Sequence, residues 1–84
     1  MPYRNIFIAN EAKMRLKNNQ LIVFNGNEFS FPIEDIKSIV VDNPRTTLSA
    51  KLVSYLSEQG VCLIFCDEKH TPSASLVPIG SCLL

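Results

Sequence analysis

The stretch IKSIVVDNPRTTLSAKLVSYLSEQGVCLIFC, residues 36–66, decides the fold. Residues 36–41 and 61–66 are short apolar runs with many β-branched residues, a pattern that favours strands, and the second run has the continuity of a buried strand. Between them, Leu48, Leu52 and Leu56 recur at helical spacing. A threonine at 46 or 47 can cap a helix, and Gly60 stands where a left-handed C-cap is expected. The stretch predicts a strand–helix–strand crossover with one helix over about residues 46–59.

The residues before this stretch are typical of a β meander. Alternating apolar residues predict a first strand at 4–9 and a second around 14–16, and an Asn18-Asn19 turn leads into a strand at 20–24. Asn25-Gly26 predicts a tight hairpin that pairs residues 21–24 with 28–31.

Proline marks the limits of two further strands. Pro32 ends the second strand of the hairpin or places it at an edge, because proline has no N–H for a ladder. A last strand is expected at 74–79, interrupted by Pro78. The fold class predicted is α+β, mainly β: a small β-sandwich-like domain over residues 1–79, followed by a ragged end at 80–84.

The size and charge of the chain indicate a single domain and give no sign of a membrane protein or of a strongly basic nucleic-acid-binding protein. The chain has 84 residues, enough for one domain. Eight basic residues balance eight acidic ones, so net charge gives no general attraction to nucleic acid or to anionic membranes. No apolar run approaches the roughly 20 residues of a membrane span, and the start lacks the apolar core of a signal peptide. We therefore expect a cytoplasmic protein without a membrane partner.

The three cysteines do not suggest a disulfide framework. Cys62 and Cys66 lie in one predicted strand, where four residues separate their Cα atoms by about 13 Å. A disulfide needs Cα atoms within about 7 Å. These two thiols are expected to be buried and reduced.

One polar turn offers side chains that could carry chemistry. Cys66, Asp67, Glu68 and His70 could ligate a metal, but zinc sites usually combine two separated ligand segments and the chain has no second one. A Cys66–His70 nucleophilic pair is disfavoured because the thiol is expected to face the core. We interpret the turn as solvated surface, with a small metal-binding protein as a weaker alternative, and expect no catalytic, cofactor-binding or metal-binding residue.

Basic residues form the one candidate nucleic-acid site. Lys13, Arg15 and Lys17 alternate, so a strand would place all three on one face, and Arg4 could extend them into a positive stripe. Such a stripe could contact phosphates. The alternative is an exposed sheet face or edge protected by charge.

Several short segments together resemble one known family, the CRISPR-associated endonuclease "Cas one", which integrates new spacers. They occur in the family's order and spacing over about residues 4–79. Their sequences are RNIFI (4–8), LKNNQLIV (16–23), IEDI (33–36), IVVD (39–42), TLSAKL (47–52), GV (60–61), IFCDEKHTP (64–72) and LVP (76–78). Within the penultimate segment, Phe65-Cys66-Asp67 with Lys69-His70 and Pro72 is most similar to the type II branch, which accompanies the Cas-nine systems.

The resemblance implies an N-terminal β domain joined to a helical domain whose triad binds Mg²⁺ or Mn²⁺. The metal there would activate a 3′-hydroxyl or a water for attack on a DNA phosphodiester. None of the triad's positions occurs in this sequence, and residues 80–84 would begin the linker to that missing domain. The family's partners would be double-stranded DNA and the small adaptation protein "Cas two". We predict a dimerisation and DNA-support domain that forms a homodimer, holds no cofactor and is inactive alone. The alternative is a stand-alone, non-enzymatic protein-interaction module.

Overall fold

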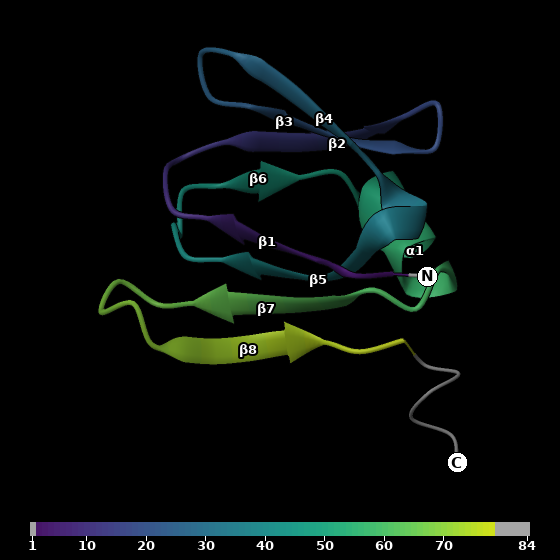
Figure 1. Cartoon of the computed structure of the whole chain (residues 1–84). Coiled ribbons are helices and arrows are strands. Elements are labelled where there is room, and N and C mark those ends of the chain that lie inside the picture. Colours follow the sequence, from purple (N-terminus) through teal and green to yellow (C-terminus); the bar gives the residue numbers. More distant parts are fainter. Residues whose placement is uncertain (1, 79–84) are drawn as a thin grey trace.

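Two four-stranded sheets and one α-helix make up the part of the chain that the structure describes (Figure 1). The computed structural model describes residues 2–78. In chain order the elements are β1 (Arg4–Ile8), β2 (Lys13–Lys17), β3 (Gln20–Phe24), β4 (Glu28–Pro32), a 3₁₀ turn η1 (Ile33–Asp35), β5 (Ile36–Val41), β6 (Thr47–Leu48), α1 (Ala50–Glu58), β7 (Cys62–Cys66) and β8 (Pro72–Leu76). The predicted mainly β, sandwich-like fold is confirmed.

The first sheet has the order β1-β5-β7-β8, and the second has the order β4-β3-β2-β6. In the first sheet β1, β5 and β7 run parallel, so the predicted strand–helix–strand crossover joins two neighbouring strands, β5 and β7. The second sheet is built from two antiparallel hairpins, β2–β3 and β3–β4, and β6 adds to its edge in parallel with β2.

The core lies between the sheets and is closed at one end by the helix (Figure 1). Alternation along each strand sends one set of apolar side chains inward. Ile39 and Leu63 of the first sheet and Leu21 of the second are almost fully buried, together with Leu52 and Leu56 of α1. No helix in the part of the chain that the structure describes has both the length and the apolar character to cross a bilayer.

Two turns confirm the predicted register of the second sheet. Asn18 and Asn19 both adopt positive φ, 52° and 60°, between the paired residues Lys17 and Gln20. This is the conformation that a two-residue hairpin loop requires. The next hairpin pairs residues 21–24 with 28–31 as predicted, through a loop of residues 25–27 in which Gly26 has a φ of 105°.

The start of the helix corrects the sequence prediction. The helix begins at Ala50 rather than near residue 46, and its cap is Ser49, whose Oγ accepts the N–H of Leu52 at 3.2 Å. Thr47 and Leu48 instead form β6 beside Lys13 and Met14. The backbone N–H of Thr47 donates to the carbonyl of Ala12 at 3.0 Å, so pairing with a strand distant in sequence prevails over local helical spacing.

The end of the helix follows the prediction. Gly60 has a φ of 77° and donates its N–H to Ser57, while the N–H of Val61 donates to Leu56 at 2.9 Å. These two bonds form a Schellman motif and direct the chain into β7.

The corrected cap gives a direct test. Ser49→Ala removes the acceptor for an N–H of the first turn and should lower the free energy of unfolding by about 1 kcal/mol. The matched control is Thr47→Ala, which should change it by less than about 0.5 kcal/mol because Thr47 is exposed and does not cap the helix. Urea titration followed by far-UV circular dichroism measures both. An equal loss in the two variants would contradict the assignment of Ser49 as the cap.

The last strand also differs from its predicted bounds. β8 begins at Pro72, where its first residue pairs with Cys66 across a bulge, and it ends at Leu76, before Pro78. Proline is tolerated at the first position of a strand, and Pro78 has no N–H with which to continue the ladder. Ile79, predicted as the end of this strand, Cys82 and the predicted ragged end at 80–84 lie outside the described residues.

Candidate nucleic-acid interface

The outer face of the second sheet carries the predicted basic residues of β2. Lys13, Arg15 and Lys17 are exposed, whereas Met14, which alternates with them, is 3% exposed and belongs to the core. Because Met14 and Leu16 pack inward, the alternating basic side chains are held on the solvent face. We call this row of three residues the basic stripe.

Neighbouring strands frame the basic stripe with one acid and one exposed aromatic ring. Arg15 donates to Glu28 of β4 at 3.2 Å, and both side chains are 55% exposed. A pair so exposed contributes only about 0–1 kcal/mol, so an incoming phosphate can compete for Arg15. Phe24, opposite Lys13 in the ladder, is 47% exposed. Exposed cations on one strand face suit contact with a phosphate backbone.

Ile22 is a buried apolar residue on this face. It lies opposite Arg15 in the β2–β3 ladder and is 5% exposed, yet it is outside the main core cluster. The outer face thus has a small buried apolar centre of its own beneath polar side chains. The long stems of Arg and Lys are suited to covering such a residue while their charges stay in water.

Arg4 lies apart from the basic stripe. It starts β1 in the other sheet, and its guanidinium carbon lies 5.6 Å from the centre of the Phe31 ring and 5.7 Å from that of Tyr3. Its burial is intermediate, and its Nη2 donates to the Tyr3 hydroxyl at 3.4 Å. The structure therefore brings together three of the four predicted residues and places Arg4 on a different surface.

The polar turn after β7 is held by its own hydrogen bonds. Asp67 Oδ1 accepts the backbone N–H groups of Lys69 at 2.9 Å and Thr71 at 3.1 Å, which closes the turn locally. His70 has a φ of 63°, and its Nδ1 lies 3.0 Å from Asp42 Oδ2. Among residues 2–78, no three Asp, Glu, His or Cys side chains converge as a metal site requires.

Cys66 is unsuited to act as a nucleophile. It is 9% exposed, and burial, together with a hydrogen bond to Asp42, raises the pKa of its thiol. A raised pKa keeps the thiol protonated at neutral pH, and only the thiolate is reactive. Cys62 and Cys66 are both free, as the strand geometry predicted, but only Cys66 is buried, because Cys62 lies on the half-buried outer face of β7.

The contacts of Asp42 with His70 and Cys66 were not predicted from the sequence. Asp42 directly follows β5, and Asp67 directly follows β7. Because these strands pair in parallel, both carboxylates lie at the same end of the sheet, beyond the carboxyl ends of the strands. Asp42 is 28 positions from His70, so no short motif joins them. The available signal was that each aspartate directly follows an apolar run that could form a parallel strand.

Comparison with known proteins identifies the family. The family described as CRISPR associated protein Cas1 matches residues 6–82, which is nearly the whole chain. The chain belongs to the Cas1 family. A curated relative, the CRISPR-associated endonuclease Cas1 of Neisseria meningitidis serogroup C (strain 8013), is 37% identical over 79 residues, which are 93% of this chain and 26% of that protein. The chain thus spans about a quarter of the length of this Cas1 relative.

Solved structures share the fold at low sequence identity. A Cas1 protein from Thermotoga maritima superposes with a TM-score of 0.81 at 14% identity, over 89% of this chain and 24% of that one. A Cas1–DNA complex gives 0.78 at 11% identity, over 95% and 32% of the two chains. A partial Cas6-RT-Cas1–Cas2 complex gives 0.73 at 12% identity, over 92% and 24%. The two-sheet architecture is therefore that of the N-terminal β domain of Cas1 proteins.

Proposed function

We propose that this chain is a platform domain of CRISPR spacer integration: it supports duplex DNA through the basic stripe, pairs with a second copy, and leaves phosphodiester chemistry to residues outside the described domain. The observation that carries the proposal is the basic stripe, presented on the outer face of a Cas1 N-terminal fold. Fixed phosphate contacts of this kind orient a duplex without reading its sequence.

Three points support the wider setting of this platform. One solved neighbour is a Cas1–DNA complex and another contains Cas1 with Cas2, which makes duplex DNA and Cas2 the natural candidates for partners. The proposal places the protein in the cytoplasm, where those partners would be met. The described residues do not form a site for the Mg²⁺ or Mn²⁺ that the family resemblance implies, so no chemical step is assigned to them.

The charge-reversal variant Lys13→Glu, Arg15→Glu, Lys17→Glu tests the basic stripe. If each residue neutralises one phosphate, the wild-type chain should show a log–log dependence of duplex affinity on salt with a slope of about −2.7, or an affinity loss of about 40-fold between 50 and 200 mM salt. The variant should lose this dependence together with its low-salt affinity. Fluorescence anisotropy with a labelled duplex measures both quantities.

The control changes net charge equally at other places. Lys37, Lys51 and Lys69 are exposed on β5, on α1 and in the polar turn, and they can be changed to Glu together. This triple variant should weaken binding only through the general field and should keep most of the slope. If the two triple variants weaken binding equally, the DNA contacts do not depend on the basic stripe. Arg4→Glu, measured alongside them, tests the separate prediction for Arg4.

Pairing with a second copy is supported by the outer face of the first sheet. Phe7, Val40 and Ile64 lie in register across β1, β5 and β7 on this face, and Phe7 is 61% exposed. Val40 and Ile64 are only half-buried. Exposed apolar rows of this kind are typical of interaction surfaces, and a two-fold pairing of identical faces would cover this one.

Sedimentation velocity tests the pairing. The wild-type chain should sediment as a dimer at high micromolar concentration, and Phe7→Ser should shift it toward the monomer. Phe24→Ser is the control because Phe24 is also an exposed phenylalanine, 47% exposed, but lies on the other sheet. A monomeric wild-type chain at these concentrations would refute the homodimer.

A stand-alone interaction module remains the second candidate function. The observation that favours it is an open apolar groove between β1 and β4, which could hold a protein partner without any DNA. A wild-type chain without salt-dependent duplex binding, but with a retained protein partner, would favour this candidate over the DNA platform.

A further inference from the structure

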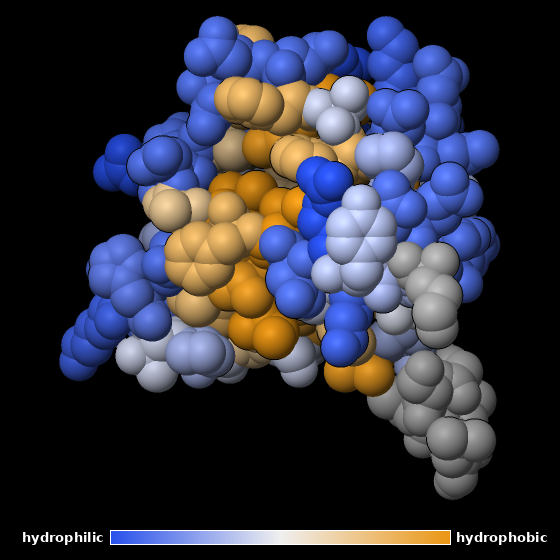
Figure 2. Space-filling model, in the orientation of Figure 1, coloured by the Kyte–Doolittle hydropathy of each residue, from blue (hydrophilic) through white to orange (hydrophobic). Residues whose placement is uncertain are grey.

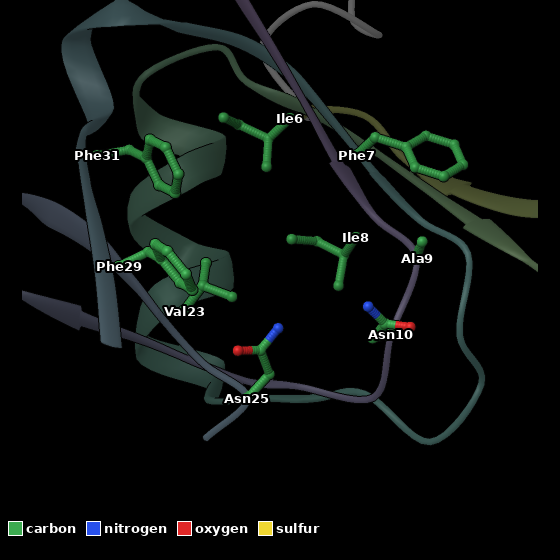
Figure 3. A pocket seen from close by; sticks show the side chains of 9 residues that line it. All are labelled: Ile6, Phe7, Ile8, Ala9, Asn10, Val23, Asn25, Phe29 and Phe31. Atoms are coloured by element: carbon green, nitrogen blue, oxygen red, sulfur yellow. The ribbon is translucent and has the colours of Figure 1, made fainter. Parts of the chain in front are cut away.

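The open side of the sandwich holds an apolar groove that lies apart from the basic stripe and meets the proposed dimer face only at Phe7. Both β1 and β4 are edge strands, and a hollow of about 290 Å³ lies between them. Ile6 and Ile8 line it from β1, and Val23, Phe29 and Phe31 line it from the second sheet (Figure 3). An orange area framed by hydrophilic blue marks apolar side chains gathered on one face of the molecule in Figure 2.

The groove is open enough to receive a ligand. Phe29 is 48% exposed although it sits on the strand face that continues the core. Figure 3 shows Phe29 and Phe31 facing Ile6 and Ile8 across the hollow, with the amides of Asn10 and Asn25 at one end and Phe7 turned away on the other side of β1. An exposed aromatic ring over buried isoleucines is a surface that an apolar side chain can cover.

The outer edge of β1 offers backbone hydrogen bonds along the groove. No described strand pairs with this edge, since β5 is the only neighbour of β1 in its sheet. The carbonyl of Ile8 accepts from Asp42 and so points toward β5. Polar backbone groups alternate along a strand, so the N–H and C=O of Phe7 point away from β5, out of the sheet. An added strand could bond to them, as in β-augmentation.

Arg4 places a positive charge on the same face of β1 as Ile6 and Ile8, at the start of the strand. Arg4, Ile6 and Ile8 alternate along β1, and the guanidinium of Arg4 lies over the ring of Phe31, which lines the groove. Its Nε is buried without a hydrogen-bond partner, and it forms no ion pair with a carboxylate of the described residues. A guanidinium held by aromatic rings and lacking a carboxylate is complementary to a bidentate anion.

We propose that the groove binds an extended segment of a partner protein, which adds a strand to the outer edge of β1, places alternate aliphatic side chains between Ile8 and Phe29, and pairs an acidic side chain with Arg4. The free strand edge supplies affinity through main-chain bonds, the groove selects aliphatic side chains, and Arg4 fixes the register. None of the residues of the basic stripe lines the groove. The proposal of peptide binding can therefore be tested independently of the proposal of DNA support.

Two synthetic peptides test the proposal on the unmodified chain. Both alternate valine with threonine and have blocked ends; one carries an aspartate near one end, and the other carries asparagine at the same place. Titration into the ¹⁵N-labelled chain should shift the amide signals of residues 4–8, and the aspartate peptide should bind about tenfold more tightly because its hydrogen bonds to Arg4 are charge-assisted. The absence of shifts at residues 4–8 with either peptide would overturn the proposal.

Variants test each contact. Arg4→Gln should abolish the preference for the aspartate peptide, and Phe29→Ser should weaken both peptides about tenfold, whereas Phe24→Ser, with the same exposure on the opposite face, should not. Phe7→Pro removes the outward N–H and should bind at least tenfold more weakly than Phe7→Val, which keeps it. Preserved dispersion of the remaining amide signals verifies that each variant folds.

Each of three results would overturn the proposal. Equal peptide binding by Arg4→Gln and the wild-type chain would remove the acidic anchor. A change in oligomeric state on Phe29→Ser, with peptide binding unaltered, would assign the groove to a second copy. A loss of duplex affinity in Arg4→Gln, with the peptide preference retained, would assign Arg4 to phosphate.

Discussion

Leu52→Ala is expected to lower the free energy of unfolding by about 2–5 kcal/mol, a range typical of truncating a buried leucine. Leu52 is fully buried on the inner face of α1, where it belongs to the same cluster as Leu21, Ile39 and Leu63 of the two sheets. Leu52 and Leu56 are the two buried residues of α1, so Leu52 supplies much of the contact between the helix and the sheets. The surrounding strands are fixed by their ladders and cannot collapse fully into the space that the leucine leaves.

The loss should be large relative to the whole. A domain of 84 residues has roughly 4–13 kcal/mol of stability at the usual 0.05–0.15 kcal/mol per residue. Urea denaturation should therefore show a midpoint lowered by about 2 M or more, given a slope near 1 kcal/mol/M for a chain this small. Lys51→Ala, one position away and exposed, should stay within about 0.5 kcal/mol of the wild type. A Leu52→Ala midpoint equal to that of Lys51→Ala would show that α1 does not close the core.

Much of the fold could be predicted from local chemistry. Asn18-Asn19 and Asn25-Gly26 have the residues that tight turns demand, and the structure places positive φ at Asn18, Asn19 and Gly26. The apolar run at 61–66 contains the predicted strand, β7, although only its Leu63 and Cys66 are buried and Ile64 is half-buried on the outer face. Gly60 ends the helix in the left-handed conformation. These predictions succeeded because each depends on the conformational limits of a few adjacent residues.

The misplaced helix start shows where local reasoning fails. Leu48 has the right spacing from Leu52 to belong to one helical face, and its neighbouring threonines are acceptable caps. The structure instead pairs Thr47 and Leu48 with β2, more than thirty positions earlier in the chain. Only the packing of the two sheets decides between a cap at 46 or 47 and a cap at Ser49, and no local signal encodes that packing.

The candidate site was predictable to the extent that it lies on one strand. Alternation alone placed Lys13, Arg15 and Lys17 on one exposed face. Arg4 is also basic, but it lies in the other sheet. Which strands are neighbours cannot be read from alternation, so the sequence alone did not show that Arg4 lies apart from the stripe. The groove was missed for the same reason: Ile8 and Phe29 come from edge strands of different sheets, and each looks like an ordinary core residue in the sequence.

The second large effect concerns the chemistry that the domain should lack. Cutting a phosphodiester with Mg²⁺ or Mn²⁺ requires several oxygen donors around one ion. In residues 2–78 the acidic and histidine side chains do not gather in such a group, and residues 79–84 contain no Asp, Glu or His. His70 Nδ1 lies 3.0 Å from Asp42 Oδ2, but these two side chains form only a two-residue pair. Support of DNA and cleavage of DNA should therefore be separable in this chain.

One measurement addresses that separation directly. The purified chain is incubated with a labelled duplex at low salt, with Mg²⁺, with Mn²⁺ or with a chelator, and both binding and strand integrity are recorded from the same samples. The platform account predicts that the duplex is bound, less tightly where a divalent ion competes for the phosphates, and that it stays equally intact in all three conditions. Cutting that requires the divalent ion and disappears in Asp42→Asn or Asp67→Asn would contradict it.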